Sequence, residues 1–174
     1  MKLKKDKILD EIIRVNHAGE FGAQRIYSGQ IKFTDDKNLK KTLKEIAEQE
    51  EVHLKFFEEM IVEKRVRPTL LHPVWDLAGF SLGAVTGLMG KDYVMACTEA
   101  VESVIVKHYR NQLKKIENMD EKKLKKNIEK FLKEEDEHRE LGNENIENEN
   151  LRVIIFKNVI ENLTKLAIKV SEKI

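Results

Sequence analysis

The sequence is poor in residues that interrupt helices and in residues that crosslink chains. It has two prolines, eight glycines and a single cysteine, Cys97, among 174 residues. One cysteine excludes an intramolecular disulfide and a cysteine-rich zinc site. Because proline is scarce while Leu, Ile, Glu and Lys abound, helix is favoured. We therefore expect an all-α protein.

Long hydrophobic runs and an excess of one charge are also absent. The longest nearly uncharged stretch, Leu77 to Met89, is too short to span a bilayer. The formal net charge is +1, so no strong field predicts a nucleic-acid partner. Met1 to Lys7 is basic but lacks an apolar run with a cleavage site, so we expect no signal peptide and a cytoplasmic setting.

The remaining composition is that of a single folded domain, residues 1–174. Hydrophobic residues make up 41% and charged residues 36%, a balance typical of soluble globular proteins. Periodicity predicts helical segments at 6–33, 37–64, 92–118, 121–141 and 151–172, with a less regular apolar segment at 74–90 between them. Asp35 and Asp36 mark a break and can cap 37–64, and Asp120 can cap 121–141. The long connector 62–91 separates two helical hairpins, which predicts a ferritin-like four-helix bundle with a crossover segment and an additional C-terminal helix.

Two segments carry the motif Glu-x-x-His inside an apolar seam. In 37–64, apolar residues recur at bundle spacing, and Glu50 and His53 occupy two of the seam positions. Glu135 and His138 do the same in 121–141. Each pair therefore directs a carboxylate and an imidazole from one helix face toward the core.

The helix before each motif carries one inward carboxylate, Glu20 in the first hairpin and Glu102 in the second. Antiparallel packing can bring each of them level with its Glu-x-x-His pair, so the two halves form a degenerate internal repeat. Polar residues one or two turns away on the same faces are candidates for hydrogen bonds to these groups, namely Asn16, Tyr27 and Tyr109.

Four carboxylates and two imidazoles at one depth of a core require a charge partner. An unpaired buried carboxylate is very costly, and no Lys or Arg lies on these seams. Two divalent cations would balance four carboxylates, and oxygen and nitrogen donors without a thiolate suit iron or manganese. The alternative is solvated charge on helix surfaces, which the two in-phase motifs disfavour.

At these residues the sequence resembles the Coq7 family, the demethoxyubiquinone hydroxylases of ubiquinone biosynthesis. The matching segments are RVNHAGEFGAQRIYSGQ (14–30), EQEEVHLKFFEEM (48–60), PVWDLAGFSLGAVTGLMG (73–90), ACTEAVESVIVKHYRNQL (96–113) and FLKEEDEHRELG (131–142). The resemblance covers nearly the whole chain, and the six candidate ligands all match.

The resemblance implies a di-iron monooxygenase that uses O₂ to hydroxylate a polyprenylated methoxy-methyl-benzoquinol, demethoxyubiquinol. Glu50 and Glu135 would bridge two Fe ions. The other ligands would be Glu20 and His53 for one ion and Glu102 and His138 for the other. The resemblance also suggests that His108 and Tyr109 assist electron transfer, with NADH, a partner reductase or the quinol itself open as the electron donor.

The implied substrate lives in a bilayer, so we expect the segment from Trp75 to Met89 to dock on a membrane surface. The protein would then be peripheral, on the cytoplasmic face of the cell membrane or on the matrix side in a mitochondrion. A buried crossover helix is the alternative reading. A lipid-presenting protein and a homo-oligomer stay open as further partners. His17 and His72 are expected not to be ligands, since neither has a Glu three residues before it.

Two other functions remain open at this point. A ferritin-like iron-binding or ferroxidase bundle shares the ligand logic but would need a large shell of subunits. A non-enzymatic helical interaction protein could use the polar seam residues only to set helix register.

Overall fold

The structure, a computed structural model, describes residues 2–174, with side chains from Lys7 onward. Met1 and the side chains of residues 2–6, on which part of the N-terminal prediction rests, lie outside the described residues. Six helices occupy the described chain: α1 (Lys2–Phe33), α2 (Lys37–Lys64), α3 (His72–Met89), α4 (Lys91–Ile116), α5 (Lys122–Glu144) and α6 (Leu151–Ser171).

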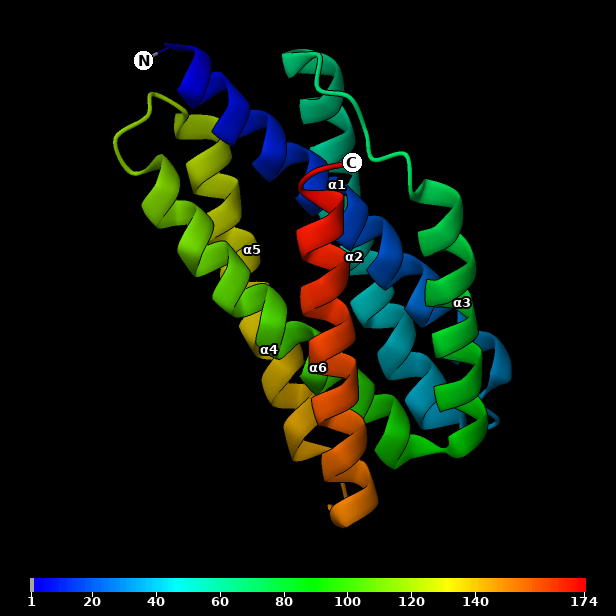
Figure 1. The fold of residues 1–174 in the computed structure, drawn as a ribbon. Coiled ribbons are helices and arrows are strands. Elements are labelled where there is room, and N and C mark those ends of the chain that lie inside the picture. The colour runs from blue at the N-terminus through cyan, green and yellow to red at the C-terminus, as the bar shows by residue number, and fades with distance from the viewer. Residues whose placement is uncertain (1) are drawn as a thin grey trace.

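Four of the helices form the bundle, and the other two lie against it. The hairpin of α1 and α2 packs beside the hairpin of α4 and α5, while α3 lies along α1 and α6 lies along α4 (Figure 1). The predicted all-α, ferritin-like arrangement with a crossover helix and an additional C-terminal helix is thus confirmed. None of these described helices is both long and apolar enough to cross a membrane.

Side chains cap the starts of two helices, α2 and α6. The Asp36 side chain accepts hydrogen bonds from two backbone N–H groups at the start of α2, and Asn150 does the same for α6. The predicted Asp120 cap is wrong, because Glu121 takes the N-cap position of α5 and its side chain makes no capping bond. Helix α3 begins at His72, earlier than predicted, because proline fits the first turn of a helix.

Two apolar clusters fill the bundle, one on each side of a polar level. The larger cluster contains Ile12, Ile13, Phe56, Phe57, Met60, Val66, Tyr109, Ile116, Leu124, Ile128 and Phe131. The smaller cluster contains Tyr27, Leu39, Leu43, Ile46, Val94 and Met95. Along each bundle helix, the candidate ligands fall between the two clusters, which keep water from the polar level.

Glycines let the crossover helix α3 approach α1 at backbone distance. A Cβ atom added to Gly83 would lie 2.0 Å from the carbonyl oxygen of Ile26, and one added to Gly29 would lie 2.4 Å from that of Phe80. No larger residue fits these two contacts without separating the helices. The glycine-rich composition of α3 is therefore a packing requirement, and it places α3 as one wall of a cavity described below.

Candidate metal centre

The six predicted ligands lie at one level in the core. Glu20 comes from α1, Glu50 and His53 from α2, Glu102 from α4, and Glu135 and His138 from α5. Each is at most 4% exposed.

Their donor atoms form two groups, each with all its atoms within 4.8 Å of one another. One group is Glu20, Glu50, His53 and Glu135, and the other is Glu50, Glu102, Glu135 and His138. Glu50 and Glu135 belong to both groups, so they lie where a bridging ligand would have to lie.

Each imidazole is held from outside the polar level by a residue of the opposite motif helix. The Nε2–H of His53 donates to Glu134 Oε2 at 2.9 Å, and the Nε2–H of His138 donates to Gln49 Oε1 at 2.6 Å. In both rings Nδ1 lies 3.1 Å from a carboxylate oxygen of the opposite helix. The inner nitrogen of each ring, Nδ1, therefore points toward the centre, where its lone pair could bind a metal ion.

Each terminal carboxylate receives a phenol hydrogen bond from the opposite hairpin. Tyr27 on α1 donates to Glu102 Oε1 at 3.1 Å, and Tyr109 on α4 donates to Glu20. In both hairpins the tyrosine follows its own hairpin's glutamate after two helical turns. These tyrosines fix the orientation of the two carboxylates.

Without a metal ion, the centre compensates its charge with protons. Burial raises the pKa of Glu20 to about 8, against an opposing hydrogen bond from His53. Burial and nearby carboxylates raise the pKa of Glu102 well above its usual range. Burial opposes protonation of His138, but the close carboxylates of Glu135 and Glu50 outweigh it and raise the pKa of His138 to about 9. Without metal, Glu20, Glu102 and His138 therefore hold protons that a bound cation would displace.

The donor set fits a pair of divalent metal ions. Three central atoms are buried without a hydrogen-bond partner: Glu50 Oε1, Glu135 Oε2 and His138 Nδ1. Among the described side chains, no Lys or Arg pairs with the four carboxylates. The ion pairs of Glu20, Glu50 and Glu135 run to the two histidines, and Glu102 accepts from Tyr27. Unsatisfied buried acceptors are costly, and divalent cations would satisfy them. The buried Glu and His clusters can thus hold metal ions.

Asn16 does not contact the centre, unlike the two tyrosines predicted beside it. Its side chain exchanges two hydrogen bonds with Gln112 on α4, at 2.9 and 2.7 Å, because the amide of Gln112 faces it across the helix interface. Gln112 Nε2 also lies 2.6 Å from His108 Nε2. The half-buried His108 has its pKa lowered to about 4, chiefly by burial. His108 is thus linked to α1 through buried amides and belongs to neither donor group, whereas Tyr109 contacts Glu20.

The two remaining histidines form a separate cluster. The rings of His17 and His72 lie 5.3 Å apart between centroids, and neither residue belongs to a donor group. Burial, with a smaller contribution from His72, lowers the pKa of His17 to about 4. The two rings therefore lie apart from both donor groups.

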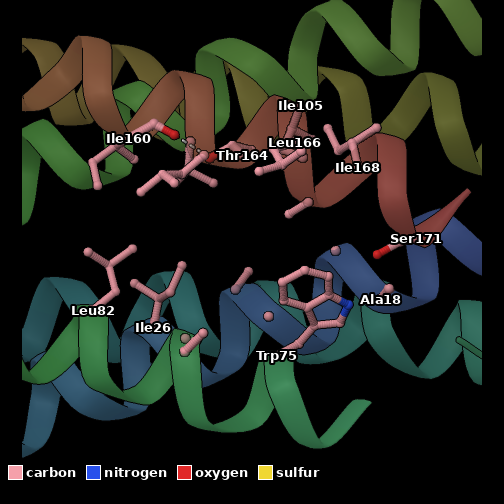
Figure 2. A pocket seen from close by; sticks show the side chains of 18 of the residues that line it. Ala18, Ile26, Trp75, Leu82, Ile105, Ile160, Thr164, Leu166, Ile168 and Ser171 are labelled. Carbon is pink, nitrogen blue, oxygen red and sulfur yellow. Dashed lines mark hydrogen bonds between the residues drawn. The ribbon is translucent and has the colours of Figure 1, made fainter. Parts of the chain in front are cut away.

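An apolar cavity of about 330 Å³ opens beside the bundle. Helix α6 forms one wall together with Ile105 of α4, and α1 and α3 form the other (Figure 2). In that view Ile160, Leu166 and Ile168 face Leu82, Ile26 and Trp75 across the cavity. A long apolar molecule would match this lining.

A second, much smaller cavity of about 10 Å³ lies between this apolar cavity and Glu102. The two cavities share the wall residues Ala23, Ile26 and Val101, and the smaller one reaches Glu102 and Tyr27. The apolar cavity is therefore separated from the Glu102 side of the centre by a constriction of three small or branched side chains.

The residues that hold the imidazoles are not among the site residues predicted from the sequence. Gln49 and Glu134 each stand immediately before the glutamate of a Glu-x-x-His motif. This shared position could have identified them, because a polar residue directly precedes the glutamate in both motifs. Gln112 carried no comparable signal.

Comparison with known proteins gives consistent matches over most of the chain. Residues 7–171 match the family described as "Ubiquinone biosynthesis protein COQ7". A Dictyostelium discoideum protein named "NADPH-dependent 3-demethoxyubiquinone 3-hydroxylase, mitochondrial" is 49% identical over 81% of this chain and 65% of its own length. The human protein of the same name is 41% identical over 95% of this chain and 78% of its own length. A Rhodospirillum rubrum protein named "3-demethoxyubiquinol 3-hydroxylase" is 41% identical over 96% of this chain and 79% of its own length.

Proposed function

The chain belongs to the COQ7 family of ubiquinone biosynthesis proteins, and from this we propose that it is a demethoxyubiquinol hydroxylase. One atom of O₂ becomes a ring hydroxyl of the quinol, and the other leaves as water after a reductant supplies two electrons and two protons. The observation that carries this proposal is the pair of buried donor groups sharing Glu50 and Glu135, next to an apolar cavity. The relatives' names support the substrate class.

Two iron ions are the proposed cofactor. Glu50 and Glu135 would bridge them; Glu20 and His53 would complete one position, and Glu102 and His138 the other. When bound, iron would supply the electrons that activate O₂. The chain's own part is to orient the donors, through Tyr27 and Tyr109 among others, and to exclude water through the two apolar clusters.

The apolar cavity is the proposed site of the isoprenoid tail. Its lining of aliphatic side chains from α1, α3, α4 and α6 would bury a chain of methyl-branched units at a gain of about 25 cal/mol per Å². The ring would approach Glu102 through the constriction at Ala23, Ile26 and Val101, whose side chains must move to admit it. A ferroxidase has no use for such a cavity.

The same region supports peripheral docking on a membrane. Leu163 and Leu166 line the cavity yet are more than half exposed, at 54% and 57%, so they lie at its mouth. Leu77 and Leu88 on α3 are still more exposed, although they lie outside the cavity lining. The apolar rim that Leu163 and Leu166 form on the α6 wall would let the tail pass from a bilayer into the cavity. The location would be the cytoplasmic face of the cell membrane, or the matrix side in a mitochondrion.

The electron source is proposed to be a reduced nicotinamide, because the names of several relatives specify NADPH. Tyr109, which donates to Glu20, and the neighbouring His108 would assist the transfer. Tyr109 supports this role by its direct contact with Glu20, and His108 is its neighbour in the chain and contacts Gln112.

The test is turnover by the purified protein. With reductant, O₂ and a short-chain methoxy-benzoquinone, it should form the hydroxylated ring. Replacing Glu135 with Ala should abolish product and lower the metal content, because it removes an oxygen donor shared by both groups. Full activity in Glu135→Ala would contradict the proposed site.

A further inference from the structure

The two halves of the centre have the same ligands and the same tyrosine contacts. They differ in the charge of the residue that accepts the outer N–H of each imidazole. Tyr27 and Tyr109 donate to the opposite terminal carboxylates, and both histidines turn Nδ1 inward. The acceptors behind the rings differ, however. His53 is backed by the carboxylate of Glu134, whereas its counterpart is backed by the neutral amide of Gln49.

This difference acts on the metal-binding nitrogen. A carboxylate that accepts the outer N–H draws that proton toward itself and makes the inner nitrogen a stronger donor, more than a neutral amide does. Its negative charge also attracts a dication directly. Both effects favour the position that includes His53.

The nearby cation does not cancel the effect. Lys130 Nζ lies 3.3 Å from the other oxygen of Glu134, but the Lys130 side chain is 55% exposed and water screens it. The contact between Glu134 and His53 lies deeper, since the Glu134 side chain is 22% exposed and the ring is buried.

We propose that Glu134 and Gln49 are positioning residues that make the two metal positions unequal, so that the Glu20/His53 position binds a divalent ion first and more tightly. The Glu102/His138 position, where Glu102 borders the small cavity, is the weaker one. This inference rests on the proposed metal centre but not on the hydroxylation.

The experiment is a titration of the metal-free, full-length protein with Mn²⁺, followed by calorimetry and by the electron paramagnetic resonance of free Mn²⁺. The wild type should bind two ions with separable affinities. Glu134→Gln keeps an acceptor for the ring and removes only the charge, so it should weaken the tight step roughly 10- to 100-fold. The matched variant Gln49→Glu should tighten the weak step by a similar factor.

Two ligand variants assign the steps. Glu20→Ala should remove the tight step, and Glu102→Ala the weak one. An unchanged thermal midpoint of metal-free Glu134→Gln shows that only the charge was altered. If Glu134→Gln does not fold, the response of the weak step to Gln49→Glu tests the inference by itself. Equal affinities in the wild type, or no response to either exchange, would overturn the inference. Because no product is measured, a failed hydroxylation assay leaves this result standing.

Discussion

At the scale of single residues, the metal-free centre retains protons on two of its ligands, Glu20 because of burial and His138 because of the neighbouring carboxylates. The pKa values of Glu20 and His138 are raised to about 8 and about 9, so the folded metal-free state binds protons that the unfolded chain releases earlier. Their stabilising contribution is complete at low pH. It is lost between pH 4.5 and about 8 for Glu20, and between pH 6.5 and about 9 for His138.

Metal binding has the opposite dependence on pH, because a cation must displace these protons. Between about pH 6 and pH 9, the thermal midpoint of the metal-free protein should fall, while the increase in midpoint caused by Mn²⁺ should grow. Differential scanning calorimetry measures both. The metal-free slope should become shallower in Glu20→Gln, and an Mn²⁺ effect that shrinks with rising pH would contradict the assignment.

The constriction beside Glu102 should be sensitive to side-chain size. Val101→Phe would fill the wall shared by the two cavities, and the rate of quinol hydroxylation should drop by about 100-fold with the metal content unchanged. Val52→Phe is the matched control, because Val52 is 52% exposed on α2. Normal turnover by Val101→Phe would show that substrate reaches the centre by another route.

The sequence predicted the convergence of the six donors because seam spacing specifies which helix face each side chain occupies. It could not predict what lies behind the imidazoles, since Gln49 and Glu134 meet them only through the relative placement of α2 and α5. The same holds for Asn16, whose partner Gln112 is set by the crossing of α1 and α4. Contacts between helices follow from tertiary geometry, which periodicity does not encode.

At the scale of helices, the contact between α3 and α1 should tolerate no added atom. Gly83→Ala places a methyl group against the carbonyl oxygen of Ile26 and should destabilise the fold by about 2 kcal/mol. Denaturant unfolding measures this. Gly22→Ala is the control on α1, where an added Cβ meets nothing within 4 Å. That change should be neutral or slightly stabilising, because alanine favours helix. Equal losses in both variants would contradict the close packing.

Helix positions were predictable because long amphipathic periods define them, whereas some ends were not. Asp120 looked like a cap from its place before a periodic segment, but Glu121 starts α5 without a side-chain bond. The role of the α3 glycines was also hidden, since the sequence shows small residues but not the backbone that they approach.

At the scale of the whole molecule, the apolar rim should direct the protein to bilayers. The double variant Leu163→Glu, Leu166→Glu should lower binding to phosphatidylcholine–phosphatidylglycerol vesicles by at least about ten-fold, since each exposed leucine loses its apolar transfer energy. Cosedimentation measures the binding. Val62→Glu is the control, because Val62 is 77% exposed near the end of α2, outside the cavity lining. Equal binding by both variants would contradict docking through the rim.

The central claim is that buried carboxylates and imidazoles at one level hold two metal ions. Elemental analysis of the purified wild-type protein, beside Glu50→Ala, tests this most directly. We predict two iron ions per chain in the wild type and a marked loss in the variant, because Glu50 belongs to both donor groups. A stably folded wild-type protein that contains neither iron nor manganese, and gains no thermal stability when they are added, would contradict the claim.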